Sequence, residues 1–402
     1  MCRLLAVLAL CFVATGAWGQ SARKLLSLGS GGIRLHSLAP NVRLIAIGDS
    51  ITIGSVAVSF VPMANMAAGG VYYIPVGGNL GVGGTSTAQM VSGQLPTALT
   101  LNAKVATVMG GVNDIISGFS VASIEANLNT IYSSLRTVGC IPIAVTILPD
   151  SAFTGGQESK RLAVNAWIMA QPNILHVNMD ATAYNSSATY TVDGLHPNWF
   201  GAQYVGSFVG AALASLSTAS TILYTNTSDW GSQLTNADLA GTGGTLNSGA
   251  TGVAATGWTI DVNVTGLTIV GSKSVDGSGF NHQIITFSGT SSGTGGVFFQ
   301  KSNTMTWGAN AQYEAWANVT ISGCSGANAG FSYFSAGNVS NDVITNTISG
   351  AMRSYPPIAF PSPTSGGSGS ILTQFVLFVS AGAVACTVDI SRPTTRVVSP
   401  PP

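Results

Sequence analysis

The sequence predicts two domains of different fold class, an α/β domain with a parallel sheet followed by an all-β sandwich. In residues 41–217, short apolar runs alternate with helical stretches, which is typical of a parallel sheet covered by helices on both faces. Over residues 218–395 the helical periodicity disappears, and short runs rich in Val, Ile, Thr and aromatic residues are separated by Gly, Ser and Asn clusters. Such runs predict antiparallel strands packed as two sheets.

Hydrophobic periodicity places the elements of the α/β domain. A helix is indicated by four apolar residues at the spacing of one helix face, namely Ile124, Leu128, Ile131 and Leu135. Gly139 follows, where a left-handed residue commonly ends a helix. We expect further helices over residues 158–169 and 200–216, and strands over residues 43–47, 105–109, 141–148 and 175–178.

The composition excludes several classes of protein. Charged residues make up 7% of the 402 residues, and 14 Lys and Arg balance 14 Asp and Glu. A nucleic-acid-binding protein needs a basic face to neutralise phosphates, so this balance argues against that class. The 50 glycines follow no Gly-X-Y period, which excludes collagen.

Residues 1–19 have the features of a signal peptide. Arg3 precedes an apolar run, Leu4–Val13, and Ala17-Trp18-Gly19 offers small residues at the cleavage positions. The run is shorter than the roughly 20 residues of a membrane span, and the alternative is an anchor that is not cleaved. We therefore expect a secreted or periplasmic mature chain without a membrane span, with a flexible lead-in over residues 20–40 and a disordered tail over residues 396–402.

The mature chain keeps three cysteines. Cys140 lies in an apolar run typical of a buried strand, so we expect a free thiol there. Cys324 and Cys386 both belong to the β domain, and pairing them is the simplest arrangement in an oxidising compartment. Because no Cys or His spacing matches a metal site, the sequence predicts neither a metal nor a cofactor.

The β domain holds tryptophans among many Tyr, Asn and Thr residues, namely Trp230, Trp258, Trp307 and Trp316. With the stretch Leu234–Leu239 they resemble the start of a jelly-roll domain of the carbohydrate-binding type, closed by a hairpin over residues 375–390. The resemblance implies that aromatic rings stack on sugar rings. The alternative is that the tryptophans fill the core of the sandwich.

Four short motifs lie at the ends of the expected strands and helices. Gly48-Asp49-Ser50 and Gly110–Asp114 directly follow strands, at the edge where open parallel sheets hold ligands. Asn79–Gly84 is a glycine-rich loop that can present backbone N–H groups, and Asp193–Pro197 precedes the last helix. Each motif alone is compatible with a turn, but four in this order are not explained by turns.

With these motifs, residues 41–216 resemble the SGNH hydrolases, the GDSL esterase superfamily. The resemblance implies a flavodoxin-like three-layer α/β/α fold. It also implies Ser50 as the nucleophile, His196 as the general base and Asp193 as the residue that orients the base.

The same resemblance implies an oxyanion hole. Its donors would be the N–H groups of Ser50 and Gly84 and the side-chain amide of Asn113, with Gly83 or Gly81 as alternatives to Gly84. Asp49 and Asp114, beside two of these residues, are expected to bond loop N–H groups around the site.

The implied activity is that of a secreted serine esterase, which hydrolyses carboxylic esters through an acyl-enzyme. Considered with the β domain, it predicts an acylated polysaccharide, for example an acetylated one, as the substrate. Lipase, aryl esterase and thioesterase activities stay open, because loops shape the acyl-binding cleft, and the apolar segment 55–76 is expected to line it. The non-enzymatic alternative is a surface adhesion protein that uses the α/β domain as a scaffold. A degenerate scaffold is expected to lack one of the motif residues, and all are present.

Overall fold

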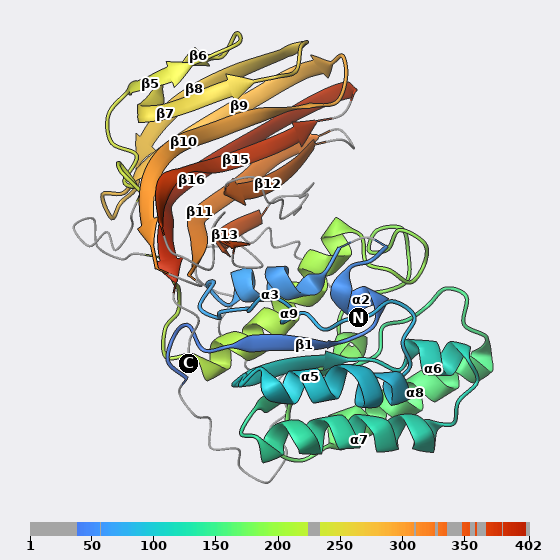
Figure 1. Cartoon of the computed structure of the whole chain (residues 1–402). Helices are drawn as coiled ribbons and strands as arrows, with labels where there is room; N and C mark the ends of the chain where they lie inside the picture. The colour runs from blue at the N-terminus through green and yellow to red at the C-terminus, as the bar shows by residue number, and fades with distance from the viewer. Residues whose placement is uncertain are drawn as a thin grey trace, which may run out of the picture.

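The computed structural model describes residues 38–56, 58–223, 234–308, 311–325, 329–335, 348–353, 358–359, 367–379 and 381–398. The predicted signal peptide, most of the predicted lead-in, Trp230 and the last four residues lie outside these ranges. Helices and a parallel sheet form the N-terminal domain, and long strands form the C-terminal domain (Figure 1). Among the helices of these ranges, none combines the length and apolar character that crossing a membrane requires.

A four-stranded sheet in the order β1-β2-β3-β4, with every neighbouring pair parallel, forms the centre of the N-terminal domain. Its strands are β1 (Leu44–Gly48), β2 (Val105–Met109), β3 (Ile141–Val145) and β4 (Leu175–Val177). Nearly all their side chains are buried, as expected for apolar runs in a parallel sheet. The strand predicted over residues 141–148 is too long. Asn165 bonds both backbone groups of Ile147, so the chain leaves the sheet after Val145.

Helices cover both faces of this sheet, which confirms the predicted three-layer arrangement (Figure 1). The helices of one face are α3 (Phe60–Ala67) and α9 (Trp199–Leu216), and those of the other are α5 (Leu95–Thr100), α7 (Val121–Thr137) and α8 (Gly155–Ala170). The predicted apolar face of α7 is buried, and Gly139 after it has a φ of 75°. The shorter helices are α2 (Ser50–Ile53), α4 (Thr87–Gln89), the π-helix η2 (Met90–Gln94), α6 (Val112–Ile116) and the 3₁₀-helix η3 (Met179–Ala181).

An irregular segment that the sequence does not predict, residues 71–82, runs along the free edge of β1. It bonds β1 at successive points, Leu44 N to Tyr73 O (2.9 Å), Leu80 N to Ala46 O (2.8 Å) and Val82 N to Gly48 O (3.2 Å). The segment makes only isolated parallel bridges with the chain at β1 and no regular ladder. Its course carries the glycine-rich loop to the carboxyl end of β1, beside Ser50.

The helices α3 and α9 pack closely because two glycines of α9 face α3. A Cβ on Gly206 would lie 2.5 Å from the Cβ of Met63, and a Cβ on Gly210 would lie 2.5 Å from the Cβ of Ala67. Real Cβ atoms do not approach this closely, so any larger residue at either position would push the helices apart.

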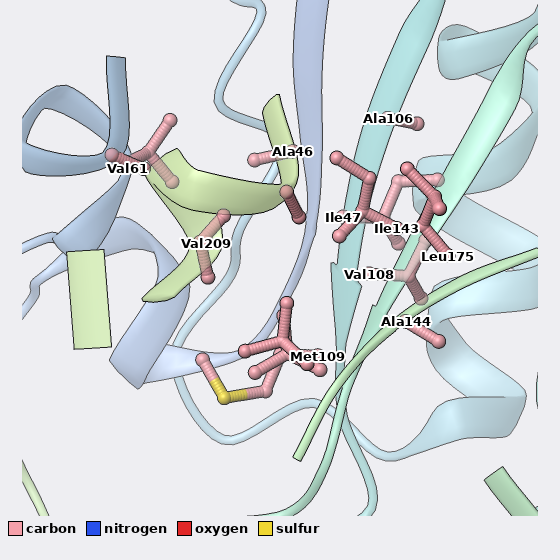
Figure 2. Close-up of a cluster of buried hydrophobic side chains, with 14 of the residues drawn as sticks. Ala46, Ile47, Val61, Ala106, Val108, Met109, Ile143, Ala144, Leu175 and Val209 are labelled. Atoms are coloured by element: carbon pink, nitrogen blue, oxygen red, sulfur yellow. The ribbon is translucent and has the colours of Figure 1, made fainter. Parts of the chain in front are cut away.

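The same helix pair covers one face of the sheet. Figure 2 shows Val61 of α3 and Val209 of α9 on the same side of β1 as Ala46. The expectation that segment 55–76 lines a substrate cleft is therefore wrong for most of its apolar residues. Those that pack inside the protein are Val58, Phe60, Val61, Tyr72 and Tyr73.

The C-terminal domain consists of two sheets, as predicted. One has five strands in the order β12-β15-β10-β7-β5, and the other has seven, in the order β13-β11-β16-β9-β8-β6 with β14 paired to β11. The strands are β5 (Gly243–Leu246), β6 (Thr251–Gly252), β7 (Ala254–Val262), β8 (Leu267–Val275), β9 (Asn281–Ser291), β10 (Gly295–Trp307), β11 (Gln312–Ser325), β12 (Ala329–Ser335), β13 (Ile348–Arg353), β14 (Ile358–Ala359), β15 (Gly367–Val379) and β16 (Gly382–Val398). Both sheets are mixed, because β5–β7 and β6–β8 are parallel pairs and the others are antiparallel.

Two of the tryptophans are buried, one in the core of the sandwich and one outside it against Leu223. Trp258 and Trp316 are 0% and 1% exposed, and Trp258 stacks on Phe299 with ring centroids 4.4 Å apart. Sugar stacking by these two residues is therefore excluded. The core alternative holds for Trp258, whereas Trp316 packs against Leu223, where the chain enters the sandwich. Trp307 is half-buried, and its ring covers Gly367 on the neighbouring strand.

The last two strands do not form the predicted closing hairpin. β15 pairs with β10 and β12, whereas β16 pairs with β11 and β9 in the other sheet. The chain thus crosses from one sheet to the other between Val379 and Gly382. β16 also continues three residues into the predicted tail, because Arg396–Val398 pair with Gln312–Glu314.

Cys386 is disulfide-bonded, and Cys140, in the described part of the α/β domain, is free and buried. The strand register places the backbone of Cys324 beside that of Cys386, since Ser322 pairs with Thr387 and Ser325 with Ala385. The side chain of Cys324 lies outside the described residues, so the pairing of Cys324 with Cys386 stays a prediction.

The two domains share apolar contacts through α3 and α9. Val58, Met63 and Ala202 of the N-terminal domain belong to the same buried cluster as the core of the sandwich. β13 lies beside α3 at the lower end of the sandwich (Figure 1). The sandwich therefore rests on the helix layer formed by α3 and α9.

The connection between the domains is packed on both sides. Leu38 forms a bridge with Ser217, directly after α9, and the Ile222 N–H donates to Gly69 O at 2.7 Å. On the side of the sandwich, Leu223 packs against Trp316, and the two residues form a small buried cluster of their own. These contacts fix where the chain enters the sandwich.

Replacing Gly210 with Ala should destabilise the protein, because the added Cβ requires α3 to move away from α9. The obstructing atoms are the Cβ of Ala67 and the backbone oxygen of Ala64, and neither can rotate away. We expect the free energy of unfolding to fall by about 1–3 kcal/mol in urea denaturation. Gly155→Ala is the matched control, since Gly155 also lies in a helix and a Cβ there meets nothing within 4 Å. Equal stability of the two variants would contradict the packing argument.

Candidate active site

Ser50 lies where the chain turns sharply from β1 into α2. The turn requires glycine at position 48, because a Cβ there would lie 2.0 Å from Thr52 Oγ1. Asp49 caps α2, since its Oδ1 accepts the Ile51 N–H at 3.0 Å. Ser50 is thereby held at the carboxyl edge of the parallel sheet, where open α/β sheets bind ligands.

His196 connects Ser50 to Asp193. Its Nε2 lies 2.9 Å from Ser50 Oγ, and its Nδ1 lies 2.7 Å from Asp193 Oδ2, although Ser50 and His196 are 146 residues apart in the chain. With Nδ1–H donating to the carboxylate, Nε2 carries the lone pair and can accept the proton of the Ser50 hydroxyl. The fold thus brings together the three residues that the sequence assigns to catalysis.

Asp193 and His196 are held by one tight turn. Asp193 Oδ1 accepts the N–H groups of Leu195 at 3.1 Å and His196 at 2.8 Å. Burial opposes ionisation of Asp193, but these bonds and the His196 ring outweigh it, so the pKa of Asp193 lies below its usual value. The carboxylate therefore stays ionised beside the imidazole.

The loop after β3 holds this turn in place. The Ser151 N–H donates to Gly194 O at 3.0 Å. Gly194 has a φ of 92°, and a Cβ on it would lie 1.9 Å from Ser151 Oγ. Only glycine fits at position 194, both for its backbone conformation and for the close approach.

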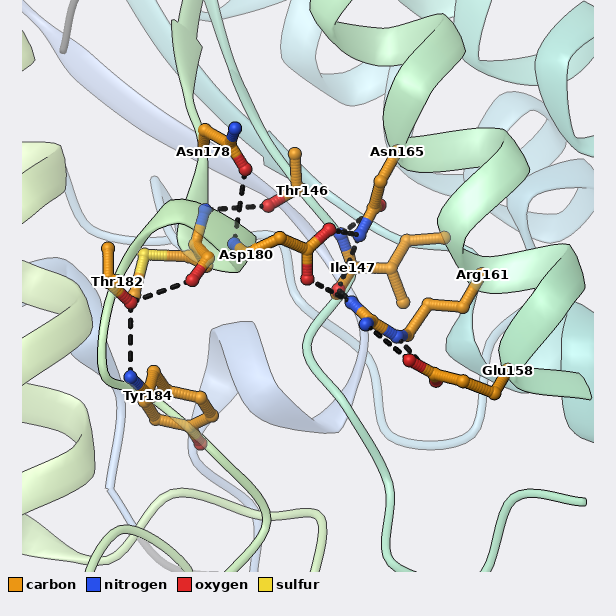
Figure 3. A network of polar contacts seen from close by, with 10 residues as sticks. Thr146, Ile147, Glu158, Arg161, Asn165, Asn178, Asp180, Thr182 and Tyr184 are labelled. Atoms are coloured by element: carbon orange, nitrogen blue, oxygen red, sulfur yellow. Dashed lines mark hydrogen bonds and ion pairs between the residues drawn. The ribbon is translucent and has the colours of Figure 1, made fainter. Parts of the chain in front are cut away.

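A polar network around Arg161 fixes the loops that follow β3 and β4 (Figure 3). Arg161 donates to Ile147 O at 2.9 Å and to Asp180 Oδ1 at 2.5 Å. Asn165 bonds Asp180 Oδ2 at 2.8 Å and both backbone groups of Ile147. Glu158 binds Arg161 from the other side at 2.6 Å, and this hydrogen bond lowers the pKa of Glu158. The network thus holds Ile147, which lies in the same loop as Ser151, the residue that bonds the turn that carries Asp193.

The structure narrows the choice of glycine for the oxyanion hole. Gly81 is excluded as a donor, since its N–H already donates to Asn79 Oδ1 at 3.1 Å. Gly84 has a φ of 76°, and a Cβ on it would meet nothing within 4 Å, so the space beside it is open. Asn113 Nδ2 donates to Thr85 O at 3.0 Å, which leaves its second N–H for a ligand.

The glycine-rich loop lies next to Ser50. A Cβ on Gly83 would be 3.9 Å from the Ser50 Cβ. For the Gly84 N–H, the described residues provide no acceptor, as an oxyanion donor requires before substrate binds. The Ser50 N–H, at the first position of α2, is also outside the helical bonding pattern. The geometry is therefore compatible with Ser50, Gly84 and Asn113 as donors, with Gly83 as the alternative to Gly84.

Asp114 bonds the chain just after the glycine-rich loop. Its Oδ2 accepts the Thr87 N–H at 2.8 Å, and its Oδ1 accepts the Thr87 hydroxyl at 2.7 Å. Asn127 donates to the same hydroxyl at 3.0 Å. Asp49 and Asp114 thus both bond loop N–H groups, as expected.

Sequence reasoning missed the buried polar side chains that hold the loops of the site. Gln94, Arg161 and Asn165 each bond backbone groups of a segment that is distant in the chain. The available signal was that each is a polar residue on the buried side of a helix and therefore needs a partner. Local sequence does not reveal which partner it takes.

The other described histidines have different surroundings from those of His196. Within the described ranges, no group of His, Cys, Asp and Glu side chains is arranged to hold a metal ion. His282 of the sandwich bonds Asp389 at 2.7 Å and so joins β9 to β16. His176 is buried in β4. His196 is the histidine that lies against the Ser50 hydroxyl.

Exposed apolar side chains flank the motifs of the site. Each lies within six residues of Ser50, Gly84, Asn113 or Asp193 and is more than a third exposed, namely Ile53, Val56, Val82, Ile116, Phe119 and Val192. A Cβ on Gly81 would lie 3.0 Å from the Ile53 Cβ, so Ile53 and the glycine-rich loop are neighbours. Exposed apolar groups around a site favour a ligand with an apolar part.

Known proteins are similar to the N-terminal domain. Residues 46–204 match the sequence model of the GDSL-like Lipase/Acylhydrolase family. A search of curated proteins gave no match. Similar solved structures include a lipase/acylhydrolase from Enterococcus faecalis (20% identity, TM-score 0.37, 43% of this chain and 95% of that chain) and a GDSL-like lipase from Bacteroides thetaiotaomicron (18%, 0.34, 43% and 87%). Another is a catalytic mutant of an acetylxylan esterase from Geobacillus stearothermophilus (14%, 0.37, 46% and 98%).

Replacing Asp49 with Asn should remove a pH-dependent loss of stability. Burial raises the pKa of Asp49 to about 7, against the Ile51 hydrogen bond and the attraction of His196, which lower it. This pKa exceeds the ordinary value of 3.8, so between pH 3.8 and about 7 the folded state binds more protons than the unfolded state. The contribution of Asp49 to stability therefore falls as pH rises through that range. Asn keeps the acceptor for Ile51 without the charge. The melting temperature of Asp49→Asn minus that of wild type should therefore increase as pH rises from 4 to 7.

Asp150→Asn is the control for this measurement. Asp150 also accepts a loop N–H two residues ahead, that of Ala152 at 2.9 Å, but it is less buried than Asp49. If the difference in melting temperature between Asp49→Asn and wild type stays constant from pH 4 to pH 7, the Asp49 carboxyl is ionised throughout that range.

Proposed function

Residues 46–204 form a domain of the GDSL-like lipase/acylhydrolase family, a family of carboxylic ester hydrolases, and from this premise we propose that the protein is a serine esterase that forms an acyl-enzyme on Ser50. The observation that carries the proposal is the hydrogen-bonded series from Asp193 through His196 to Ser50, with distances of 2.7 and 2.9 Å. This series gives the serine hydroxyl a base and gives the base a group that orients it.

In the first step, Ser50 Oγ attacks the ester carbonyl while His196 Nε2 accepts the hydroxyl proton. The imidazolium that forms is stabilised by the Asp193 carboxylate, which is ionised because its pKa lies below the usual value. His196 then returns the proton to the alcohol oxygen as the carbon–oxygen bond of the ester breaks. The products are the free alcohol and an acyl group bonded to Ser50.

Negative charge develops on the former carbonyl oxygen during this attack. The Ser50 N–H, the Gly84 N–H and the second N–H of Asn113 are the proposed donors to it. Donors of this kind contribute about 3–4 kcal/mol each to lowering a barrier, provided they are already in place. The bond from Asn113 to Thr85 keeps the amide oriented before the charge appears.

In the second step, water replaces the alcohol. His196 accepts a proton from a water molecule as its oxygen attacks the acyl carbon, and the same donors stabilise the second oxyanion. The bond to Ser50 then breaks, Ser50 Oγ recovers a proton from His196, and the carboxylic acid leaves. The chain supplies every group that these steps require.

We propose further that the protein is secreted and that the alcohol part of its ester is a polysaccharide. The apolar run Leu4–Val13 supports export. Exposed, uncharged hydroxyl side chains along β8 and β9 support contact with a polymer of sugars, namely Thr268, Ser272, Ser274, Thr286 and Ser288. With Trp258 and Trp316 both buried, such neutral hydrogen bonds would carry most of the contact.

A second candidate function is hydrolysis of esters with an apolar acyl chain. The exposed apolar side chains beside the site favour it, since an acyl chain lying over them would remove apolar surface from water. The two candidates share the chemistry at Ser50 and differ in which part of the substrate the protein recognises.

Ser50→Ala and His196→Ala should each reduce kcat on p-nitrophenyl butyrate by about 10⁴ or more, with the circular dichroism spectrum unchanged. The double variant should lose no more than either single variant, because the two residues act as a unit.

Asn113→Ala should be milder than Ser50→Ala and His196→Ala, with a loss of about 10²–10³ in kcat, because it removes one oxyanion donor. If Ser50→Ala kept more than about a hundredth of the wild-type kcat, the assignment of the nucleophile would be wrong.

The substrate proposals are separated by a panel of p-nitrophenyl acetate, butyrate and octanoate together with acetylated xylan, tested on the full chain. Release of acetate from xylan by wild type, and none by Ser50→Ala, supports the polysaccharide. The apolar acyl chain is favoured if kcat/KM rises with chain length and no acetate is released from xylan. The rise should correspond to a free energy of up to about 0.8 kcal/mol per buried CH₂. In that case Phe119→Ala should flatten the rise, because Phe119 is one of the exposed apolar residues.

A further inference from the structure

Gln94, the last residue of the π-helix η2, is buried and bonds the chain two residues before Ser50. Its Oε1 accepts the Gly48 N–H at 3.0 Å, and its Nε2 donates to Gly48 O at 2.8 Å. One side-chain amide therefore bonds both backbone groups of a single residue, as a neighbouring strand would. This fixes the end of β1 at the point from which Ser50 projects.

The same amide reaches the glycine-rich loop. Nε2 of Gln94 also lies 3.3 Å from Thr85 Oγ1, and the Thr85 hydroxyl donates to Val82 O at 2.8 Å, which closes the loop around Gly84. The backbone oxygen of Thr85 accepts the Asn113 amide. Gln94 and Asn113 thus hold the two sides of Thr85, the residue next to Gly84.

The π-helical turn places Gln94 in this position. The Leu95 N–H donates to Met90 O, five residues back, so the turn contains one residue more than an α-helical turn. Met90 and Gln94 are both buried, whereas a Cβ on Gly93 would meet nothing within 4 Å. π-helical turns are rare and occur frequently at functional sites.

We propose that Gln94 is a positioning residue that sets the place of the oxyanion hole relative to Ser50. The inference rests on the proposed esterase function, since it concerns the oxyanion of acyl transfer. Donors accelerate the reaction only when they are fixed where the charge will develop, and a misplacement of about 1 Å can cost about 10²-fold in rate. The hydrogen bonds of Gln94 go to Gly48 and Thr85 and not to Ser50, so it acts through these two residues.

Three variants and one control test the proposal in the full chain. Gln94→Leu removes all three hydrogen bonds. Gln94→Glu keeps an acceptor for the Gly48 N–H and, when ionised, has no donor for Gly48 O or Thr85. Thr85→Val leaves the bonds between Gln94 and Gly48 intact. It removes the hydroxyl that links Gln94 to the loop, together with the bonds of that hydroxyl to Val82 O and Gly48 O. Ser92→Ala is the control, because Ser92 is an exposed residue of the same π-helix.

For p-nitrophenyl butyrate we expect kcat to fall by about 10- to 100-fold in Gln94→Leu and Gln94→Glu, with KM within about twofold of wild type. The inhibition constant of a butylboronic acid, which forms a tetrahedral adduct on a serine hydroxyl, should rise by the same factor as kcat falls. Thr85→Val should show a smaller loss with the same pattern, and Ser92→Ala should match wild type. If Gln94→Leu does not fold, Gln94→Glu and Thr85→Val decide the outcome.

A double-mutant cycle separates positioning from a purely structural role. In an Asn113→Ala background, where the hole already lacks a donor, Gln94→Glu should cost less than it does in wild type. An equal factor in both backgrounds, or a rise in KM with kcat unchanged, would overturn the proposal.

Labelling of Ser50 by a fluorophosphonate, followed by intact mass, distinguishes the two levels of inference. No labelling of wild type would overturn the esterase function itself. Labelling of wild type and of Gln94→Glu at equal rates would overturn only the role of Gln94.

Discussion

The close approach of α3 and α9 is the constraint on which both the site and the domain interface depend. α3 follows the segment that carries Ser50, and α9 follows the turn that carries His196, so the packing of these helices holds the two segments in one layer. Gly206 and Gly210 make the approach possible, because any Cβ at either position would collide with α3. In the same fold, the side chains of Ser50 and His196 are 2.9 Å apart although 146 residues separate them in the chain. The sandwich packs on the same helix pair, so its position depends on the same glycines.

Within that frame, buried amides and carboxylates hold the loops of the site. The backbone groups of these loops lie outside the regular sheet and need partners of their own. Gln94 bonds the end of β1, Asp114 bonds the start of α4, and Asn165 bonds the loop after β3. Because each partner comes from a helix on the sheet, the donors and the base are in place before a substrate arrives. This is the condition under which electrostatic stabilisation of an oxyanion is effective.

Much of this arrangement could be predicted from the sequence, and what could not shares a physical cause. The parallel strands and the helix over Ile124–Leu135 follow from periodicity, and the motifs around Ser50 and His196 follow from their positions at strand and helix ends. Pairing between distant segments leaves no such local signal. The edge segment at residues 71–82 has no strand periodicity because it bonds β1 irregularly, and the crossing of β15 and β16 into different sheets depends on partners far away. Trp258 could stack on a sugar or on Phe299, and only the fold decides between them.

The packed interface implies that the sandwich affects the site by supporting it. The buried cluster of the sandwich includes Val58, eight residues after Ser50, and Met63 of α3, so its atoms replace water on the outer side of the segment that follows the nucleophile. Removing the sandwich would expose these apolar residues. It would also remove the contact that Leu223 makes with Trp316. The free energy of packing between the sandwich and α3 therefore contributes to holding α3 against α9. The sandwich is therefore part of the scaffold of the site, because its core packs directly on α3.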